Sequence, residues 1–269
     1  MKNTIKINKK INSFKKEIEV PGDKSISIRC VLLASQGIGT SKIYNLLESE
    51  DVINSLKSIK KLGIDYVKLK NCYIIKGFGF DGYKTDRKLN IYSGNSGTFA
   101  RLVLGLLVNS KNQITIKGDK SLSKRDFIRV IKPLEKFGAI FDSNYGKLPI
   151  KIQGTKNTKP IKYFENKGSA QVKSTVMFAA LNTQGETIIK AFKSRDHSEL
   201  LFKYLKLPIK VIKRKKYDII KVKGGKKIPA LNYKIPSDIS SAAFFIVLTA
   251  LSKNSRLKIK NVNINPSRM

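Results

Sequence analysis

The stretch GSAQVKSTVMFAALNTQGETIIK, residues 168–190, carries the pattern that decides the fold. It opens with small residues and a glutamine, continues as an apolar run typical of a buried helix, and passes through a polar turn into a β-branched strand. A helix N-cap needs only one small polar residue. The row of Gly168, Ser169, Ala170 and Gln171 therefore indicates that the start of this helix does more than cap it.

The same arrangement recurs along the chain at a fixed period. The four helices open at Ser25, Gly97, Ser169 and Ser240, with spacings of 72, 72 and 71 residues. A polar turn and a β-branched strand follow each helix. In the first three copies a second helix with one apolar face follows, over residues 50–63, 124–138 and 195–207. Short strands come after this second helix. We therefore predict an α/β (α+β) fold built of repeated β-α-β-α-β-β units.

Length and composition indicate a globular chain of one large or two ordinary domains. It has 269 residues, of which 41% are hydrophobic. The first 20 residues are charged and lack the apolar segment of a secretory signal, and the uncharged apolar run 239–251 is too short to span a bilayer. Cys30, Cys72 and a single histidine indicate neither a disulfide framework nor a metal site. We expect a protein of the reducing cytoplasm with no membrane contact.

The net charge of +35 suggests a nucleic-acid partner at first sight. Only nine of the 54 basic residues are arginine, however, and lysine accompanies abundant asparagine and isoleucine, as expected of an A/T-rich genome. We therefore interpret basic runs such as 213–216 as solvated surface and expect no nucleic-acid partner. Because arginine is scarce, the five that fall in the repeated motifs are informative: Arg29, Arg101, Arg125, Arg195 and Arg268.

The repeated helix starts are suited to binding anions. A helix N-terminus carries unpaired N–H groups and about half a positive charge, and small residues let an anion approach the backbone. Lys24 and Arg29 flank the start at Ser25, and Arg101 lies one turn inside the helix that begins at Gly97. Three such starts facing one cleft would form a strongly cationic site.

Each of these signals also has an ordinary structural explanation. The segment GNSGT, residues 94–98, fits a turn followed by a cap, and Arg101 could equally pair with an aspartate or a backbone carbonyl. His197 fits the first turn of a helix better than a catalytic base. The helix dipole alone would account for the acidic residues near helix starts, Asp23, Glu48 and Asp51. The recurrence at one period is what favours ligand binding.

Taken together, the motifs resemble the 5-enolpyruvylshikimate-3-phosphate synthase family over essentially the whole chain. In the order and spacing of that family the chain carries PGDKSISIR (21–29), GNSGT with Arg101, KR (124–125), GSAQVKS (168–174), SRDHSE (194–199), PSDISSAAFF (236–245) and NPSR (265–268). The resemblance implies two domains of three units each, with helix N-termini facing the cleft between them. It implies transfer of the enolpyruvyl group of phosphoenolpyruvate to the 5-hydroxyl of shikimate 3-phosphate, with release of phosphate, by a monomer that needs no metal or organic cofactor.

The resemblance also implies roles for individual positions. Lys24 corresponds to a catalytic, substrate-positioning residue that touches both substrates, and Gly97 and Arg125 correspond to the phosphoenolpyruvate side. Gln171 corresponds to a residue that reaches between the two substrates. The positions implied to bind shikimate 3-phosphate are Ser25, Arg29, Ser169, Ala170, Ser194 and Arg195. Two positions depart from the usual pattern, since Asp23 stands in place of serine and Asp126 in place of proline. An acid beside Lys24 would either weaken anion binding or orient the lysine.

The family layout further implies a division into domains. Residues 21–237 correspond to one complete three-unit substrate-binding domain, and residues 1–20 and 238–269 correspond to part of a second, truncated domain. The family's acid and base segments have no counterpart in the sequence. We therefore expect weak binding of shikimate 3-phosphate, no turnover by residues 1–269 alone, and an exposed apolar face on the helix 239–251. The alternative is a non-catalytic anion- or RNA-binding protein on the same fold, which the net charge would favour.

Overall fold

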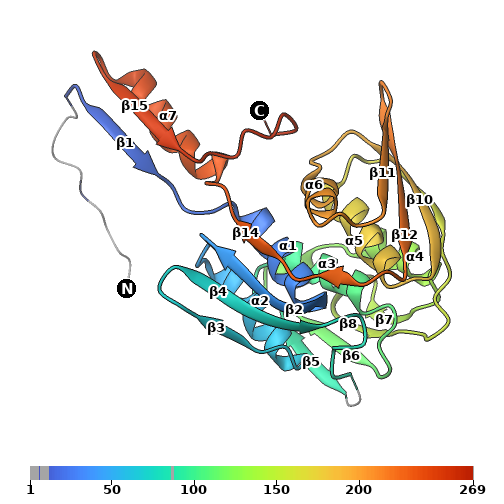
Figure 1. Cartoon of the computed structure of the whole chain (residues 1–269). Helices are drawn as coiled ribbons and strands as arrows, with labels where there is room; N and C mark the ends of the chain where they lie inside the picture. Colours follow the sequence, from blue (N-terminus) through green and yellow to red (C-terminus); the bar gives the residue numbers. More distant parts are fainter. Residues whose placement is uncertain (1–5, 7–11, 86–87, 269) are drawn as a thin grey trace.

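Three sheets of one topology make up most of the computed structural model, which describes residues 6, 12–85 and 88–268 (Figure 1). The second copy runs β5 (Leu89–Tyr92), α3 (Gly97–Leu106), β6 (Ile114–Lys117), α4 (Ile128–Glu135), β7 (Ile140–Asn144), β8 (Lys147–Gln153). The third runs β9 (Lys162–Glu165), α5 (Ala170–Leu181), β10 (Gly185–Phe192), α6 (His197–Tyr204), β11 (Ile209–Lys213), β12 (Tyr217–Gly224). Their strand orders are equivalent, β5-β6-β8-β7 and β9-β10-β12-β11, with the first pair parallel and the others antiparallel. The predicted repeat and fold class are confirmed.

The first copy takes its opening strand from far along the chain. It contains α1 (Lys24–Gln36), β2 (Gly37–Tyr44), α2 (Glu50–Lys61), β3 (Tyr66–Lys68) and β4 (Cys72–Phe78). The parallel neighbour of β2 is supplied by β13 (Ile228–Pro229) and β14 (Asn232–Lys234), with Asn232 opposite Lys42. The segment after the third copy thus completes the first sheet.

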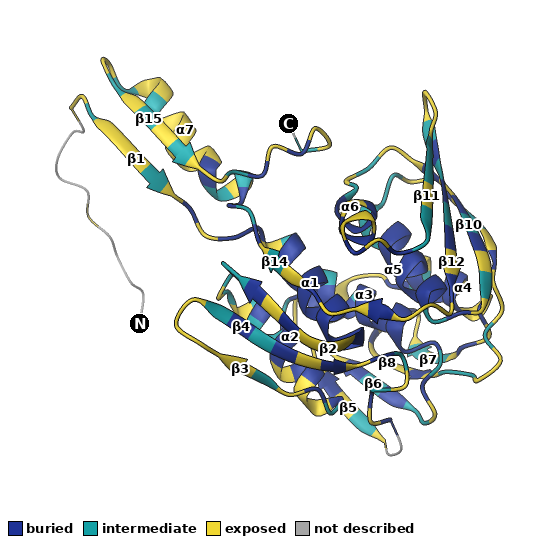
Figure 2. Ribbon diagram, in the orientation of Figure 1, coloured by how far each residue is buried: buried dark blue, intermediate teal, exposed yellow. Residues whose placement is uncertain are grey.

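The strand that precedes α1 belongs to a different sheet. β1 (Lys15–Glu19) pairs in parallel with β15 (Arg256–Lys260), and these two strands project from the rest of the chain together with α7 (Ile239–Leu251) (Figure 1). β1 therefore opens a fourth unit as β5 and β9 open theirs. Only Ala242 of α7 is buried, whereas Phe244 and Leu251 are 79% and 81% exposed (Figure 2). In the described part of the chain, no helix combines the length and the apolarity needed to cross a membrane.

The core lies among α1, α3 and α5, which are buried along most of their length (Figure 2). Helices α3 and α5 approach closely because Gly105 has no side chain, and a Cβ there would lie 2.4 Å from the carbonyl oxygen of Thr175. The hydroxyl of Thr175 donates a hydrogen bond to the carbonyl of Arg101 at 3.1 Å. This contact joins the middle of α5 to the middle of α3.

The prediction of one helix over residues 124–138 is wrong in its bounds. The chain forms a short 3-10 turn at Leu122–Lys124, extends at Arg125, and enters α4 only at Ile128. The carboxylate of Asp126 accepts a hydrogen bond from the N–H of Ile128 at 2.7 Å. Because this aspartate satisfies an N–H at the start of α4, the helix begins there rather than at the basic pair 124–125.

Candidate anion-binding site

A pocket of about 780 Å³ lies beside the start of α5. Its walls are the α5 start, the loop between β10 and α6 with the facing ends of β11 and β12, and the segment that follows β15. The lining residues are Gly168, Ser169, Ala170, Gln171, Lys193, Ser194, Arg195, Asp196, Lys213, Asp218, Asn265, Pro266 and Ser267. The structure thus brings together five of the predicted binding residues: Ser169, Ala170, Gln171, Ser194 and Arg195.

The small residues at the start of α5 have separate tasks. Gly168 has φ +66°, a left-handed conformation that side-chain-bearing residues rarely adopt. Ser169 is the N-cap, and its hydroxyl accepts from the N–H of Val172 at 3.3 Å. The buried carboxylate of Glu165 accepts from the N–H of Ser169 at 2.9 Å, which holds the turn in place. Ala170 then presents only a methyl group to the pocket, so a ligand can approach the helix backbone.

Gln171 connects the starts of α5 and α3. Its Oε1 accepts from Nη1 of Arg101 at 2.9 Å, and its Nε2 donates to the hydroxyl of Thr98 at 3.0 Å. Arg101 also donates to the carbonyls of Gly97 and Asp126, each at 3.2 Å. Of the alternatives left open by the sequence, Arg101 therefore takes the role of pairing with backbone carbonyls, and it also anchors Gln171.

Gly97 leaves room for two guanidinium groups at the start of α3. A Cβ on Gly97 would lie 2.7 Å from Nη1 of Arg101 and 3.0 Å from Nη1 of Arg125. Arg101 also lies over the ring of Phe127, 4.6 Å from its centroid. Burial, and then the neighbouring charge of Arg125, lower the pKa of Arg101. Two like charges held together at a helix N-terminus favour the binding of an anion.

Arg29 lies buried between α1, α5 and α6. Its Nε donates to the hydroxyl of Ser198 at 2.8 Å, Nη2 to the hydroxyl of Ser174 at 3.0 Å, and Nη1 to the carbonyl of Ser25 at 2.9 Å. Burial lowers the pKa of Arg29 to about 10, while the charge of Glu199 raises it, so the guanidinium stays charged at neutral pH. Ser174 and Ser198 were not predicted as site residues, although both lie in the quoted motifs.

A buried ion pair joins α5 to α6 beside these serines. Nζ of Lys173 lies 2.6 Å from Oε1 of Glu199, and the two side chains are only 2% and 5% exposed. Lys173 precedes Ser174 in the chain, and Glu199 follows Ser198. The pair therefore fixes the separation of the two serines that hold Arg29.

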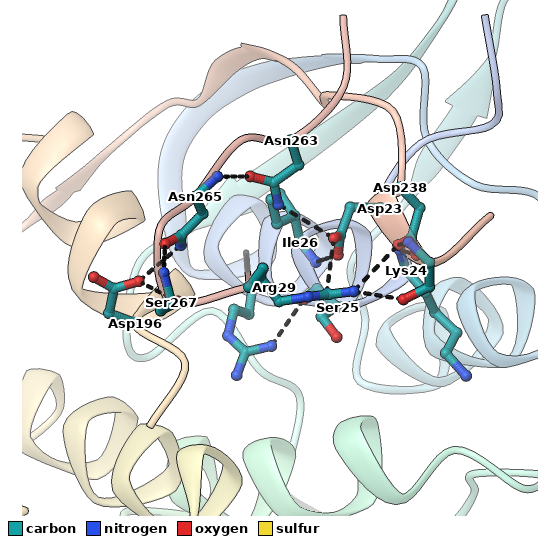
Figure 3. A network of polar contacts seen from close by, with 12 residues as sticks. Asp23, Lys24, Ser25, Ile26, Arg29, Asp196, Asp238, Asn263, Asn265 and Ser267 are labelled. Atoms are coloured by element: carbon teal, nitrogen blue, oxygen red, sulfur yellow. Dashed lines mark hydrogen bonds and ion pairs between the residues drawn. The ribbon is translucent and has the colours of Figure 1, made fainter. Parts of the chain in front are cut away.

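Asp23 and Lys24 are adjacent at the start of α1 but have different partners, and Figure 3 shows the contacts around Asp23. The fully buried Asp23 accepts from the N–H of Ile26 at 3.0 Å and pairs with Arg268 at 3.3 Å. Nζ of the half-exposed Lys24 lies 3.0 Å from the carboxylate of Asp51, and Lys24 does not line the pocket at α5. The acid next to Lys24 thus caps a helix. The helix dipole alone does not explain Asp23 and Asp51, since each also pairs with a basic side chain.

The segment after β15 forms the third wall of the pocket and reaches the start of α6 (Figure 3). Nδ2 of Asn265 and the hydroxyl of Ser267 both donate to Oδ1 of Asp196, at 2.7 and 3.0 Å. Burial raises the pKa of Asp196, but these two hydrogen bonds and the charge of Lys213 together outweigh burial and lower it. Asn265 and Ser267 were not predicted as site residues, although the NPSR motif contains both.

His197 is the first residue of α6 and is buried. Burial, and then the positive charges of Arg29 and Arg268, lower its pKa to about 4. It is therefore neutral at pH 7 and binds a proton only weakly, which makes it a poor general base. Within the described ranges, no group of three or more histidine, cysteine, aspartate or glutamate side chains could hold a metal ion.

Most of the chain matches a single protein family. Residues 8–269 match the family described as EPSP synthase (3-phosphoshikimate 1-carboxyvinyltransferase). The chain belongs to the EPSP synthase family. It is 42% identical over 258 residues to the 3-phosphoshikimate 1-carboxyvinyltransferase of Vesicomyosocius okutanii, covering 96% of this chain and 58% of that protein. Against the protein of the same name from Caldicellulosiruptor saccharolyticus it is 40% identical over 269 residues, covering 97% and 61%.

Solved structures of the family agree with the fold described above. An EPSP synthase from Acinetobacter baumannii matches with a TM-score of 0.85 at 36% identity, over 94% of this chain and 57% of that one. The chain thus spans about three fifths of the length of the relatives it matches. The family resemblance predicted from the motifs is confirmed, and the alternative of a non-catalytic anion- or RNA-binding protein gains no support.

Proposed function

We propose that this chain forms part of an enzyme that transfers the enolpyruvyl group of phosphoenolpyruvate to the 5-hydroxyl of shikimate 3-phosphate and releases phosphate. The observation that carries the proposal is the pocket at the start of α5, which Ser169, Gln171 and Arg195 line together. Each substrate carries a carboxylate and a phosphate, so helix N-termini and basic side chains must offset several negative charges before bonds can form. Membership of the EPSP synthase family supports this assignment.

Shikimate 3-phosphate occupies the α5 pocket in this proposal. Five of its proposed binding residues line that pocket: Ser169, Ala170, Gln171, Ser194 and Arg195. The other two, Ser25 and the buried Arg29, do not line it. The hydroxyl of Ser194 is buried and has no hydrogen-bond partner among the described residues, which makes it available to a phosphate or carboxylate oxygen. Arg195 is exposed beside it and can provide a paired donor fork for the same group.

Phosphoenolpyruvate lies at the start of α3 in this proposal, against Gly97 and Arg125. Lys24 lies at the neighbouring helix start and touches both substrates. Its ion pair with Asp51 is half exposed and therefore weak, so an arriving anion can draw the ammonium group away from the aspartate. Lys24 thus acts by positioning the two substrates.

We also propose that residues 21–237 form one substrate-binding domain, while residues 1–20 and 238–269 belong to a second. Completion of the first sheet by β13 and β14 supports the first part, because it encloses all three units within residues 21–237. Pairing of β1 with β15, away from the three sheets, supports the second part.

Calorimetry with shikimate 3-phosphate tests the assignment of the pocket. We expect the chain to bind the ligand, and Arg195→Ala and Arg29→Ala to weaken binding about tenfold or more, since each removes charge-assisted hydrogen bonds. Arg256→Ala, which removes an exposed arginine on β15, should bind like the wild type. Because Arg195 is exposed, its variant remains informative even where Arg29→Ala disturbs folding. Equal affinities for all four proteins would refute the assignment of the pocket. If the full-length protein released no phosphate when it was incubated with the two substrates together, the proposed reaction would be refuted.

A further inference from the structure

Two segments connect the β1–α7–β15 unit to the rest of the described chain, and they are hydrogen-bonded to each other. They are residues 21–25 and 236–240, and both have the pattern Pro-x-Asp-x-Ser. The N–H groups of Asp23 and Asp238 each donate to the proline carbonyl of the other segment, at 2.8 and 2.9 Å. These reciprocal bonds define a crossing point between the two parts of the molecule.

Each aspartate of the crossing begins a helix on its own side. Asp23 accepts from the N–H of Ile26 in α1, at 3.0 Å, and Asp238 accepts from the N–H of Ser240 in α7, at 2.8 Å. Helix α1 carries Lys24 and Ser25, whereas α7 belongs to the projecting unit. The relative position of the two carboxylates is therefore also the relative position of the two helix starts.

Arg268 holds both carboxylates at once. Its Nη1 lies 3.3 Å from Asp23, its Nη2 lies 3.5 Å from Asp238, and Nη2 also donates to the hydroxyl of Ser240 at 2.5 Å. The arginine side chain is only 6% exposed and Asp23 is fully buried, so solvent screens these charges little. A planar guanidinium can bridge two acceptors in this way, whereas an ammonium group acts as a single point charge.

The segment that carries Arg268 also reaches the pocket. Asn263 donates at 3.3 Å to Oδ2 of Asp23, the oxygen that Arg268 also contacts. Asn265 and Ser267 donate to Asp196 at 2.7 and 3.0 Å (Figure 3). This short stretch of chain therefore contacts the crossing at both ends, through Asn263 and Arg268, and forms a pocket wall between them, over residues 265–267. A displacement of the crossing would move that wall relative to the start of α5.

We propose that Arg268 is a positioning residue that fixes the β1–α7–β15 unit against the rest of the chain by clamping the two helix-capping aspartates of the crossing. Through the same clamp it keeps the pocket wall formed by residues 265–267 in place beside the predicted ligand. The positional part stands on the contacts alone, while the effect on affinity rests on the proposed function.

Distance measurements between spin labels test the clamp without any ligand. One label is placed on α2 through Lys57→Cys and the other on the turn before β15 through Lys253→Cys, in a Cys72→Ser background that leaves only the buried Cys30. We expect a narrow distance distribution for the parent chain and for the control Arg256→Gln, a broad one for Arg268→Gln, and an intermediate one for Arg268→Lys. A distribution for Arg268→Gln or Arg268→Lys as narrow as that of the parent overturns the proposal. Where Arg268→Gln fails to fold, Arg268→Lys decides alone.

Affinity for shikimate 3-phosphate provides the second measurement. We expect Arg268→Gln to weaken binding about tenfold through the displaced wall, with Arg256→Gln unchanged. Failure of the parent chain to bind would count against the proposed function and leave the label distances to decide the clamp. Unchanged affinity in Arg268→Gln together with a broadened distance distribution would overturn the link from the clamp to the pocket.

Discussion

Replacing Glu199 by glutamine leaves the ammonium group of Lys173 buried without its counter-charge. The two groups lie 2.6 Å apart, and both side chains are almost fully buried. Breaking such a pair by removing one partner typically destabilises a protein by about 3–5 kcal/mol. Since about 1 kcal/mol shifts the melting temperature of a chain of this size by roughly 2–4 °C, we expect Tm to fall by about 10 °C.

A double-mutant cycle, measured by thermal and urea unfolding, separates this effect from loss of packing. Lys173→Met and Glu199→Gln should each be strongly destabilising, while the double variant should be more stable than the sum of the two losses predicts, because no unpaired charge remains. The matched control is the exposed pair Lys151–Asp142 on β8 and β7, where Lys151→Met should change stability by less than about 1 kcal/mol. Additive losses in the cycle, or a loss at Lys151 equal to that at Lys173, would refute the reasoning.

Three further predictions concern single positions. Gly97→Ala should displace the guanidinium groups of Arg101 and Arg125, and raise KM for phosphoenolpyruvate in the full-length protein while sparing affinity for shikimate 3-phosphate; an unchanged KM would remove Gly97 from the site. The pKa of His197 is lowered to about 4, so below pH 6.5 the unfolded state binds a proton that the folded state rejects, and the free energy of unfolding should drop by about 3 kcal/mol between pH 6.5 and 4. In His197→Gln the free energy of unfolding should fall less between these two pH values, and an equal fall in the variant and the wild type would contradict the prediction. Gly105→Val should force α3 away from Thr175 and destabilise the chain by about 1–3 kcal/mol in urea unfolding, the usual cost of overpacking. Wild-type stability would show that the helices can separate without loss.

The repeated unit could be predicted because each copy contains the same short-range sequence patterns. Small residues at helix starts, apolar helices and β-branched strands recur at one period, and each signal lies within a few residues of the structure it specifies. Completion of the first sheet by β13 and β14, in place of β1, could not be predicted in this way. β14 and β2 are joined by hydrogen bonds between residues about 190 positions apart, and nothing in the repeat tells which strand fills the edge left by β1.

The candidate site shows the same division between local and distant information. Ser169, Ala170, Gln171, Ser194 and Arg195 were found from their motifs and do line one pocket. The helix over residues 124–138 was predicted too long, because its apolar pattern does not register the capping by Asp126. The side chains that hold Arg29 and the wall formed after β15 depend on contacts between separate motifs, which single-residue patterns do not encode. Short polar residues such as Ser174 and Ser198 look like any small residue until the fold brings them together.

Completion of the first sheet by β14 also sets an order of events during synthesis. When β2 leaves the ribosome its edge has no parallel partner, and it must wait for some 190 further residues before β14 arrives. At about 5–20 residues per second this interval lasts roughly 10–40 s. During that time an edge strand rich in unpaired N–H and C=O groups is open to other nascent chains. The second and third sheets take all their strands from consecutive stretches of chain and need no such wait. The first of the three units to be synthesised is therefore the last to be completed.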